Sequence, residues 1–106
     1  MKLKTINVNI TKLCKEIKDE IKNIEKACQY LEGKEYIMTI TSGNDGKHMK
    51  KSLHYENKAI DIRCKNMKYP VGTTLRIRKT LGHNYDVILE ENHIHIEYQP
   101  KYINQK

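Results

Sequence analysis

Apolar residues in the first third of the chain recur at spacings of three and four positions. This spacing is typical of an amphipathic helix, whose other face here carries lysine and glutamate side chains. Thr11 can cap the start of the helix, and Gly33 suits the position that ends it. The pattern therefore predicts one long helix over residues 11–32. The apolar positions are Ile10, Leu13, Cys14, Ile17, Ile21, Ile24, Cys28 and Leu31.

The middle of the chain is typical of β-strands rather than helix. Residues 36–41 are rich in branched side chains and are followed by Ser42-Gly43, which predicts a strand and its end. Residues 43–53 are polar and contain two glycines, which indicates a loop. Residues 59–64 alternate with period two and predict a second strand. One face of it holds Ile60, Ile62 and Cys64, and the other holds Ala59, Asp61 and Arg63.

The last third contains a short helix and a β-hairpin. The helix is predicted over residues 73–81, between Pro70 and Gly82. Residues 85–90 and 93–98 flank a two-residue turn, the connection most common in β-hairpins. This turn, Glu91-Asn92, predicts a register that pairs Glu90 with His93, Ile88 with His95, and Asp86 with Glu97.

That register separates apolar from polar side chains on the two faces of the hairpin. A shift of one residue would bury the charged groups, so we expect the register to be strongly held. It also places both histidines beside a carboxylate. The apolar face holds Tyr85, Val87, Leu89, Ile94, Ile96 and Tyr98, and the polar face holds Asp86, Glu90, His93, His95 and Glu97.

These elements predict an α+β fold in a single domain over residues 1–106. The long N-terminal helix and the short second helix would pack on one face of a small, mainly antiparallel sheet. A chain of 106 residues can build one core but has no room for a second. The core would consist of Ile, Leu, Val, Met and Tyr, since the chain contains no Phe and no Trp.

The chain is strongly basic, with a formal net charge of +7. Only three of its 20 basic residues are arginines, the residue that nucleic-acid readers use for bidentate contacts, so the charge equally suits an anionic polymer such as a cell wall. No membrane span and no signal peptide are visible, so we expect cytoplasmic synthesis and action at the wall after release or as part of a virion. Three cysteines without CxxC spacing indicate buried free thiols rather than disulfides.

Two distant segments carry residues that could bind one metal ion. His54 and Asp61 lie seven positions apart, and His93 and His95 form a second group near the C-terminus. Imidazole nitrogen and carboxylate oxygen are the ligands of catalytic Zn²⁺, where three protein groups leave a position for water. Asp61 and His95 both belong to the polar faces of their strands. Because the cysteines are scattered, an open catalytic site is favoured over a closed structural one, and the pattern points to a hydrolase.

The same residues resemble a known family. The motif Ser52-x-His54-x-x-Asn57-x-Ala59-x-Asp61 resembles the SxHxxGxAxD motif of the D-alanyl-D-alanine carboxypeptidase family of zinc peptidases, which shares its fold with the Hedgehog signalling domain. Glu91-Asn-His-Ile-His95 is similar to the second motif of that family, an acidic residue followed by His-x-His. The resemblance covers roughly residues 37–100, includes the strand end at Thr41-Ser42-Gly43, and is greatest to the small phage-encoded members.

The resemblance implies a role for each of these residues. Zn²⁺ would be held by His54, Asp61 and His95, and its water would attack a peptide bond of peptidoglycan stem peptides. His93 would lie next to the metal and stabilise the developing oxyanion. Ser52 would support the loop or the ligands. Lys47 would replace the arginine with which the family holds substrate carboxylates.

Two positions depart from the family pattern. Asn57 stands where the family has glycine, and asparagine can still adopt the left-handed backbone conformation. Asn92 stands three residues before His95, where the family commonly has its acidic general base, and an amide cannot take a proton from water. Glu90 is then the candidate base, because the hairpin register places it beside His93. If His93 were the zinc ligand instead, Glu90 would hold the standard acidic position.

Three functions follow from these observations. The first is a zinc metallopeptidase that cleaves peptidoglycan peptides, as a D-Ala-D-Ala carboxypeptidase or an L-Ala-D-Glu endopeptidase. The second is a non-catalytic zinc-binding or wall-binding module of a virion, which Asn92 favours. The third is a basic nucleic-acid-binding domain, favoured only by the charge. For the first we expect a monomer that binds no specific nucleic acid and no membrane.

Overall fold

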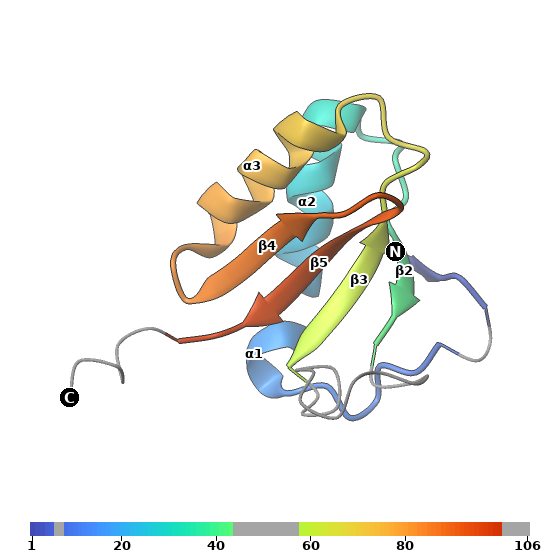
Figure 1. Cartoon of the computed structure of the whole chain (residues 1–106). Coiled ribbons are helices and arrows are strands. Elements are labelled where there is room, and N and C mark those ends of the chain that lie inside the picture. Colours follow the sequence, from blue (N-terminus) through green and yellow to red (C-terminus); the bar gives the residue numbers. More distant parts are fainter. Residues whose placement is uncertain (6–7, 44–57, 101–106) are drawn as a thin grey trace.

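The computed structural model describes residues 1–5, 8–43 and 58–100, which form an α+β fold around one five-stranded sheet (Figure 1). The α+β class is thus confirmed. No helix within these described residues has the length and apolar character needed to cross a membrane. In chain order the elements are β1 (Lys2–Leu3), α1 (Lys15–Lys18), α2 (Ile21–Glu32), β2 (Thr39–Ser42), β3 (Ala59–Arg63), α3 (Pro70–Leu81), β4 (Tyr85–Leu89) and β5 (His93–Tyr98).

The strands are ordered β1-β2-β3-β5-β4, and every pairing except one is antiparallel. The prediction of a mainly antiparallel sheet is therefore confirmed. The exception is β1, which pairs in parallel with β2 and was not predicted. Its two residues are too few to show any periodicity. The strand predicted over residues 36–41 lies slightly later in the chain, as β2.

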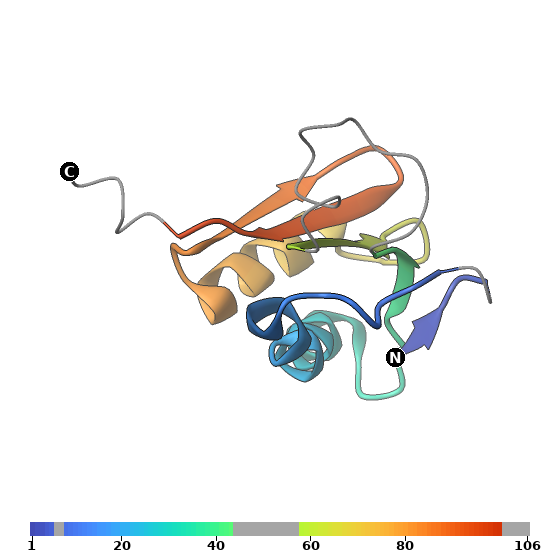
Figure 2. The same cartoon turned by 90° about the horizontal axis from the view of Figure 1, so that it is seen from below.

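All three helices lie on one face of the sheet, and no described helix covers the other (Figures 1 and 2). Strand alternation turns the isoleucines of β3 and β5 towards the helices and the polar residues between them to the opposite, open face. Apolar burial between the two layers is the main stabilising term of the fold. Side chains with 0% exposure include Ile17, Ile24, Met38, Ile40, Ile60, Ile62, Ile77, Ile94 and Ile96.

The N-terminal helix differs from its prediction. The chain forms α1 and α2 with a break at Asp19-Glu20, and residues before Lys15 are not helical. A tertiary contact accounts for the break. The Tyr85 hydroxyl of β4 donates to the Glu16 carbonyl at 3.0 Å, while the Glu20 N–H bonds the Ile17 carbonyl at 3.1 Å instead of the Glu16 carbonyl that a continuous helix would offer it. Apolar spacing alone cannot reveal such a break.

A side chain at the end of α2 binds the backbone just before α3 and determines where that helix begins. The Glu32 carboxylate accepts hydrogen bonds from the backbone N–H groups of Lys68 and Tyr69, at 2.9 and 2.7 Å. The helix then begins at Pro70, three residues earlier than predicted, where the missing N–H of proline costs nothing. Like α2 it has 12 residues, so the expectation of one long and one short helix is wrong.

The C-terminal hairpin has the predicted register. Ile88 pairs with His95 and Asp86 with Glu97, and the Glu90 N–H donates to the His93 carbonyl at 2.8 Å. Strand β5 also pairs with β3, which places the predicted polar face of the hairpin next to that of β3. The hairpin thereby joins the two segments that carry the candidate metal ligands.

Candidate metal site

Asp61 and His95 lie directly opposite each other on the open face. They are register partners in the antiparallel pair β3–β5, where directly opposed side chains on one face contact each other. His95 Nδ1 lies 2.8 Å from Asp61 Oδ1, and the two side chains are 18% and 14% exposed. Two residues that are 34 positions apart in the chain therefore meet in a partly buried ion pair.

The other ring nitrogen of His95 has a carboxylate partner of its own. Its Nε2 lies 2.7 Å from Oε1 of Glu97, two residues further along β5. A protonated imidazole donates from both nitrogens, so this form satisfies both carboxylates. The hydrogen bond to Asp61, followed by the one to Glu97, raises the pKa of His95 to about 9 against the opposing effect of burial.

His93 also lies near the Asp61 carboxylate. Its Nε2 is 3.8 Å from Asp61 Oδ1, beyond hydrogen-bond distance, and its side chain is 35% exposed. Asp61 thus has two imidazoles near it, of which His95 makes the direct contact. This geometry favours His95 over His93 as the partner of Asp61 in a metal site.

Glu90 and the turn residue Asn92 lie next to His93, at the turn end of the hairpin. Glu90 is exposed and pairs with His93 through its backbone, so its carboxylate belongs to the same end of the hairpin. The Asn92 carbonyl accepts a hydrogen bond from the Cys64 N–H at 3.3 Å, and its side chain faces a pocket beside His93.

Four predicted residues lie outside the described part of the chain. These are Lys47, Ser52, His54 and Asn57, together with most of the predicted loop over residues 43–53. Within residues 1–5, 8–43 and 58–100, no set of three or more His, Cys, Asp or Glu side chains is arranged to hold a metal ion. The described residues therefore supply only Asp61 and His95 to the proposed ligand set.

The chemistry of this pair fits zinc. One carboxylate oxygen and one imidazole nitrogen are hard and borderline donors of the kind that catalytic Zn²⁺ takes. A histidine ligand commonly donates its second N–H to a carboxylate, which orients the ring and increases its basicity. Glu97 stands in that position on Nε2, so Nδ1 is the nitrogen left to face Asp61 and a metal.

The cysteines are not candidates for the same site. All three are free thiols, and Cys28 and Cys64 are buried, as predicted, whereas Cys14 is half-buried. Burial raises the pKa of each, and that of Cys28 reaches about 12. A thiol that remains protonated at neutral pH is a poor zinc ligand.

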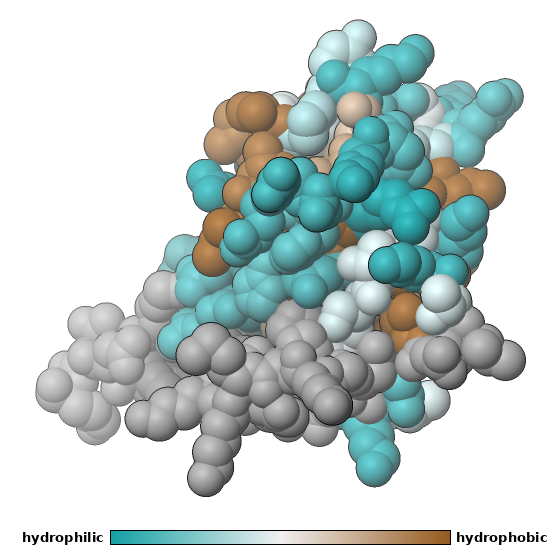
Figure 3. Space-filling model, turned by 45° about the vertical axis from the view of Figure 1, so that its right-hand side comes forward, coloured by the Kyte–Doolittle hydropathy of each residue, from teal (hydrophilic) through white to brown (hydrophobic). Residues whose placement is uncertain are grey.

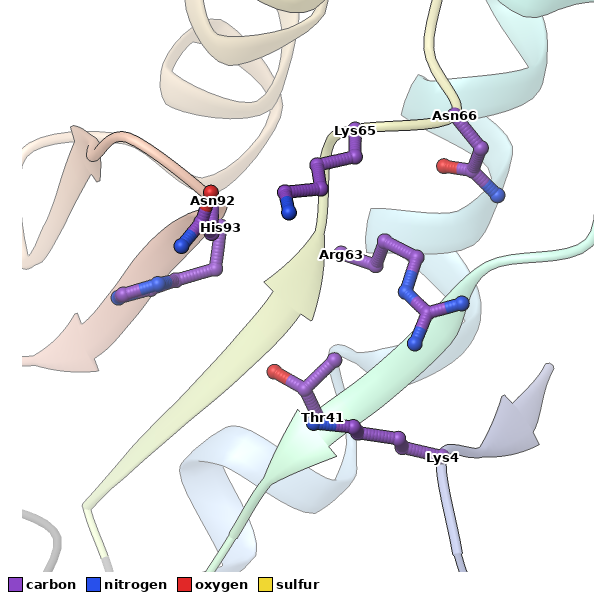
Figure 4. A pocket seen from close by; sticks show the side chains of 7 residues that line it. All are labelled: Lys4, Thr41, Arg63, Lys65, Asn66, Asn92 and His93. Carbon is purple, nitrogen blue, oxygen red and sulfur yellow. The ribbon is translucent and has the colours of Figure 1, made fainter.

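Sequence reasoning did not assign a role to two features of this face. The polar alternation of β5 had placed Glu97 beside His95, which was the signal for its role as a partner of the ring. The second feature is a basic pocket of about 450 Å³ next to His93, which includes Arg63 of β3 (Figure 4). Lys65 follows Arg63 by two positions, but the third cation, Lys4, comes from a distant part of the chain, so no local pattern could indicate the pocket.

Comparison with known proteins adds no assignment. No protein-family model matches the chain, and no curated protein matches it significantly. The function must be argued from the residues and their geometry.

Proposed function

We propose that this protein is a zinc-dependent peptidase of the D-alanyl-D-alanine carboxypeptidase type with the related Hedgehog-like fold, and that it hydrolyses peptidoglycan stem peptides. The cleaved bond would be D-Ala-D-Ala or L-Ala-D-Glu. The observation that carries the proposal is the contact of Asp61 and His95 on the open face. These are two of the three ligands that the motif resemblance implies, and they come from the two separate motifs.

The proposed zinc ligands are His54, Asp61 and His95. Zinc bound there would lower the pKa of a water molecule towards about 7 and polarise the scissile carbonyl. The raised pKa of His95 favours a proton on the nitrogen that faces Asp61 in the metal-free protein. Metal binding must displace that proton, because only neutral imidazole ligates a metal.

The residues around the ligands have separate tasks in this proposal. Glu97 holds the His95 ring through Nε2 and is a positioning residue. His93, with its exposed Nε2 near Asp61, would donate a hydrogen bond to the oxyanion that forms on the substrate. Glu90 would accept the proton of the attacking water. Its exposed place at the His93 end of the hairpin supports that role. Ser52 and Lys47 keep the supporting and carboxylate-binding roles that the resemblance implies.

A second function is favoured by one position. Asn92 occupies the place of the acidic general base in the related family, and an amide cannot accept the proton. A protein that holds zinc without turnover, as a wall-binding module of a virion, would need no base there. The two functions share the metal site and differ only in catalysis.

Metal analysis tests the site that both functions share. The purified protein should contain about one zinc per chain, and the variants His54→Ala and Asp61→Asn should lose it. Asp86→Asn, on the same face but outside the ligand set, is the matched control and should keep its zinc. A wild-type protein that takes up no zinc would overturn both functions.

Release of peptides from purified walls then separates them. The first function predicts that the wild type releases D-Ala or stem peptides and that Glu90→Gln does not. Glu91→Gln changes the neighbouring exposed carboxylate and should remain active. A zinc-loaded wild type without hydrolysis would select the second function. Equal hydrolysis by wild type and Glu90→Gln would show that another group is the base.

A further inference from the structure

The basic pocket beside His93 contains three cations and no described carboxylate. Lys4 follows β1, Arg63 ends β3, and Lys65 lies in the turn after it. None of the three makes a side-chain ion pair with another described residue. The rest of the described lining is polar and consists of Thr41, Asn66, Asn92 and His93. Positive charge that no described side chain neutralises, gathered in one concave site, favours an anionic ligand.

The cations are spread along the pocket rather than gathered at one point. Figure 4 shows Lys65 extending towards Asn92 and His93 on one side of the end of β3. Arg63 extends to the other side, towards β2, where Lys4 runs beside Thr41. Because the two groups lie on opposite sides of the end of β3, a chain with repeated negative charges can contact both of them. The arrangement therefore favours an extended polyanion.

The lining also limits the chemistry of that chain. Arginine and asparagine side chains offer hydrogen bonds in fixed directions, which suits phosphate oxygens. Among the described lining residues there is no Phe, Tyr or Trp, and His93 is the one aromatic ring on which a nucleic-acid base could stack, so successive bases of a nucleic acid would not each find a partner. The surface in the view of Figure 3 is likewise mainly hydrophilic over its described part, with hydrophobic residues in separate patches. These features favour a phosphodiester chain without bases.

We infer that the pocket of Lys4, Arg63 and Lys65 is a binding site for a base-free phosphodiester polymer. This site lies beside the candidate metal ligands. Its described lining includes His93, which is near Asp61, but neither Asp61 nor His95. It would hold the protein on an anionic polymer by charge and hydrogen bonds to successive phosphates. The inference does not depend on peptidase activity, because binding requires neither zinc nor a proton acceptor.

A binding titration tests the site with a defined probe. Fluorescently labelled poly(glycerol phosphate) is titrated with the full chain in the presence of a chelator, so that zinc has no part in the result. Lys4→Gln/Lys65→Gln removes two exposed cations of the pocket. It should lower the affinity by about tenfold or more and reduce the slope of log K against log salt by about two.

The matched control removes the same charge from the opposite side of the molecule. Lys22→Gln/Lys26→Gln changes two exposed lysines of α2, which lies behind the sheet, and should change the affinity by less than about twofold. Circular dichroism and thermal unfolding of both pairs verify that they fold. Arg63→Gln gives an independent third variant, which should also lower the affinity and should reduce the slope by about one, since it removes one charge. Equal losses from the pocket pair and the control pair would overturn the inference.

Two competitors test the class of polymer. A single-stranded oligodeoxynucleotide with the same number of phosphates should bind more weakly, because its bases find only the His93 ring to stack on among the described lining residues. A polyglutamate peptide of equal charge should also compete poorly. Tighter binding of either would assign the pocket to nucleic acid or to acidic peptides and would overturn the proposed ligand.

Discussion

The two faces of strands β3 and β5 are built from alternate residues of the same short segments, yet they depend on different physics. Towards the helices, Ile60, Ile62, Ile94 and Ile96 are fully buried. Burial of apolar area has no preferred direction and tolerates many partners. On the open face, Asp61, His95 and Glu97 depend on two short hydrogen bonds, of 2.8 and 2.7 Å. The first face should therefore govern stability and the second should govern metal chemistry.

The strongest test of this separation is a cavity in the buried face. Ile96→Ala removes a fully buried side chain of β5, and such changes typically lower the free energy of unfolding by about 2–5 kcal/mol. Urea unfolding of the metal-free protein measures the loss. Zinc affinity, measured well below the unfolding midpoint, should stay close to that of the wild type. A loss of stability below about 1 kcal/mol would show that the sheet and helices are not packed as described.

A substitution on the open face should have the opposite result, with a large effect on zinc affinity. Asp61→Asn keeps an oxygen that can accept from His95 but removes the charge that a zinc ligand needs. Zinc affinity should fall by more than about 100-fold, because loss of even an indirect partner of a metal ligand costs 10–100-fold. Competition with a fluorescent zinc chelator measures it. Asp86→Asn is the control, and an equal effect of both variants would contradict a specific role of Asp61.

Glu97 tests whether the ring of His95 is positioned by its second carboxylate. Glu97→Gln retains the shape and an acceptor oxygen for Nε2 but removes the charge. Zinc affinity should fall by about 10–100-fold, less than for Asp61→Asn. The pKa of His95, followed by NMR in the metal-free protein, should also fall, because Glu97 is one cause of its elevation. An unchanged pKa would show that Glu97 has only a structural role.

The metal-free protein should lose stability as the pH rises. The pKa of His95 is about 9 in the fold and near its ordinary value of 6.5 in the unfolded chain. Its contribution is therefore complete below pH 6.5 and is lost between that pH and about 9. Among the described residues, the titratable groups near the ring include Asp61 and Glu97, which bond it, and His93. We expect a loss on the order of 1 kcal/mol, since the cluster is partly open to solvent. His95→Gln should abolish this dependence.

The hairpin could be predicted because all of its information is local. A two-residue turn and strict alternation between charged and apolar residues leave one register in which no charge is buried. The N-terminal helix lacked such a constraint. Its break depends on the Tyr85 hydroxyl bonding the Glu16 carbonyl, a contact across 69 positions that no local pattern contains. Local periodicity predicts the kind of element better than its ends.

The candidate site was likewise predictable only in those parts that depend on local sequence. Alternation placed Asp61 and His95 on polar faces, but their contact requires β3 to pair with β5 in one register, which strand patterns do not specify. The contact of Glu97 with His95 follows instead from the alternation of β5, since the two residues are two positions apart on one face. The basic pocket was beyond prediction, because Lys4 reaches it only through the two-residue strand β1 beside β2. Motif spacing thus identified the chemistry, and strand pairing determined which side chains meet.

The smallest effect is expected from an isoleucine-to-alanine substitution on the open face. Ile88 of β4 pairs with His95 and is 45% exposed, whereas Ile96 of the neighbouring strand is fully buried. Ile88→Ala should lower the free energy of unfolding by less than about 1 kcal/mol, because little apolar area returns to water and no cavity forms. Urea unfolding of this variant and of Ile96→Ala compares the loss of the same residue type from the two faces of one hairpin. A similar loss from both variants would mean that an apolar layer covers the open face, and the candidate metal ligands would then lie in a core rather than at a surface that substrate can reach.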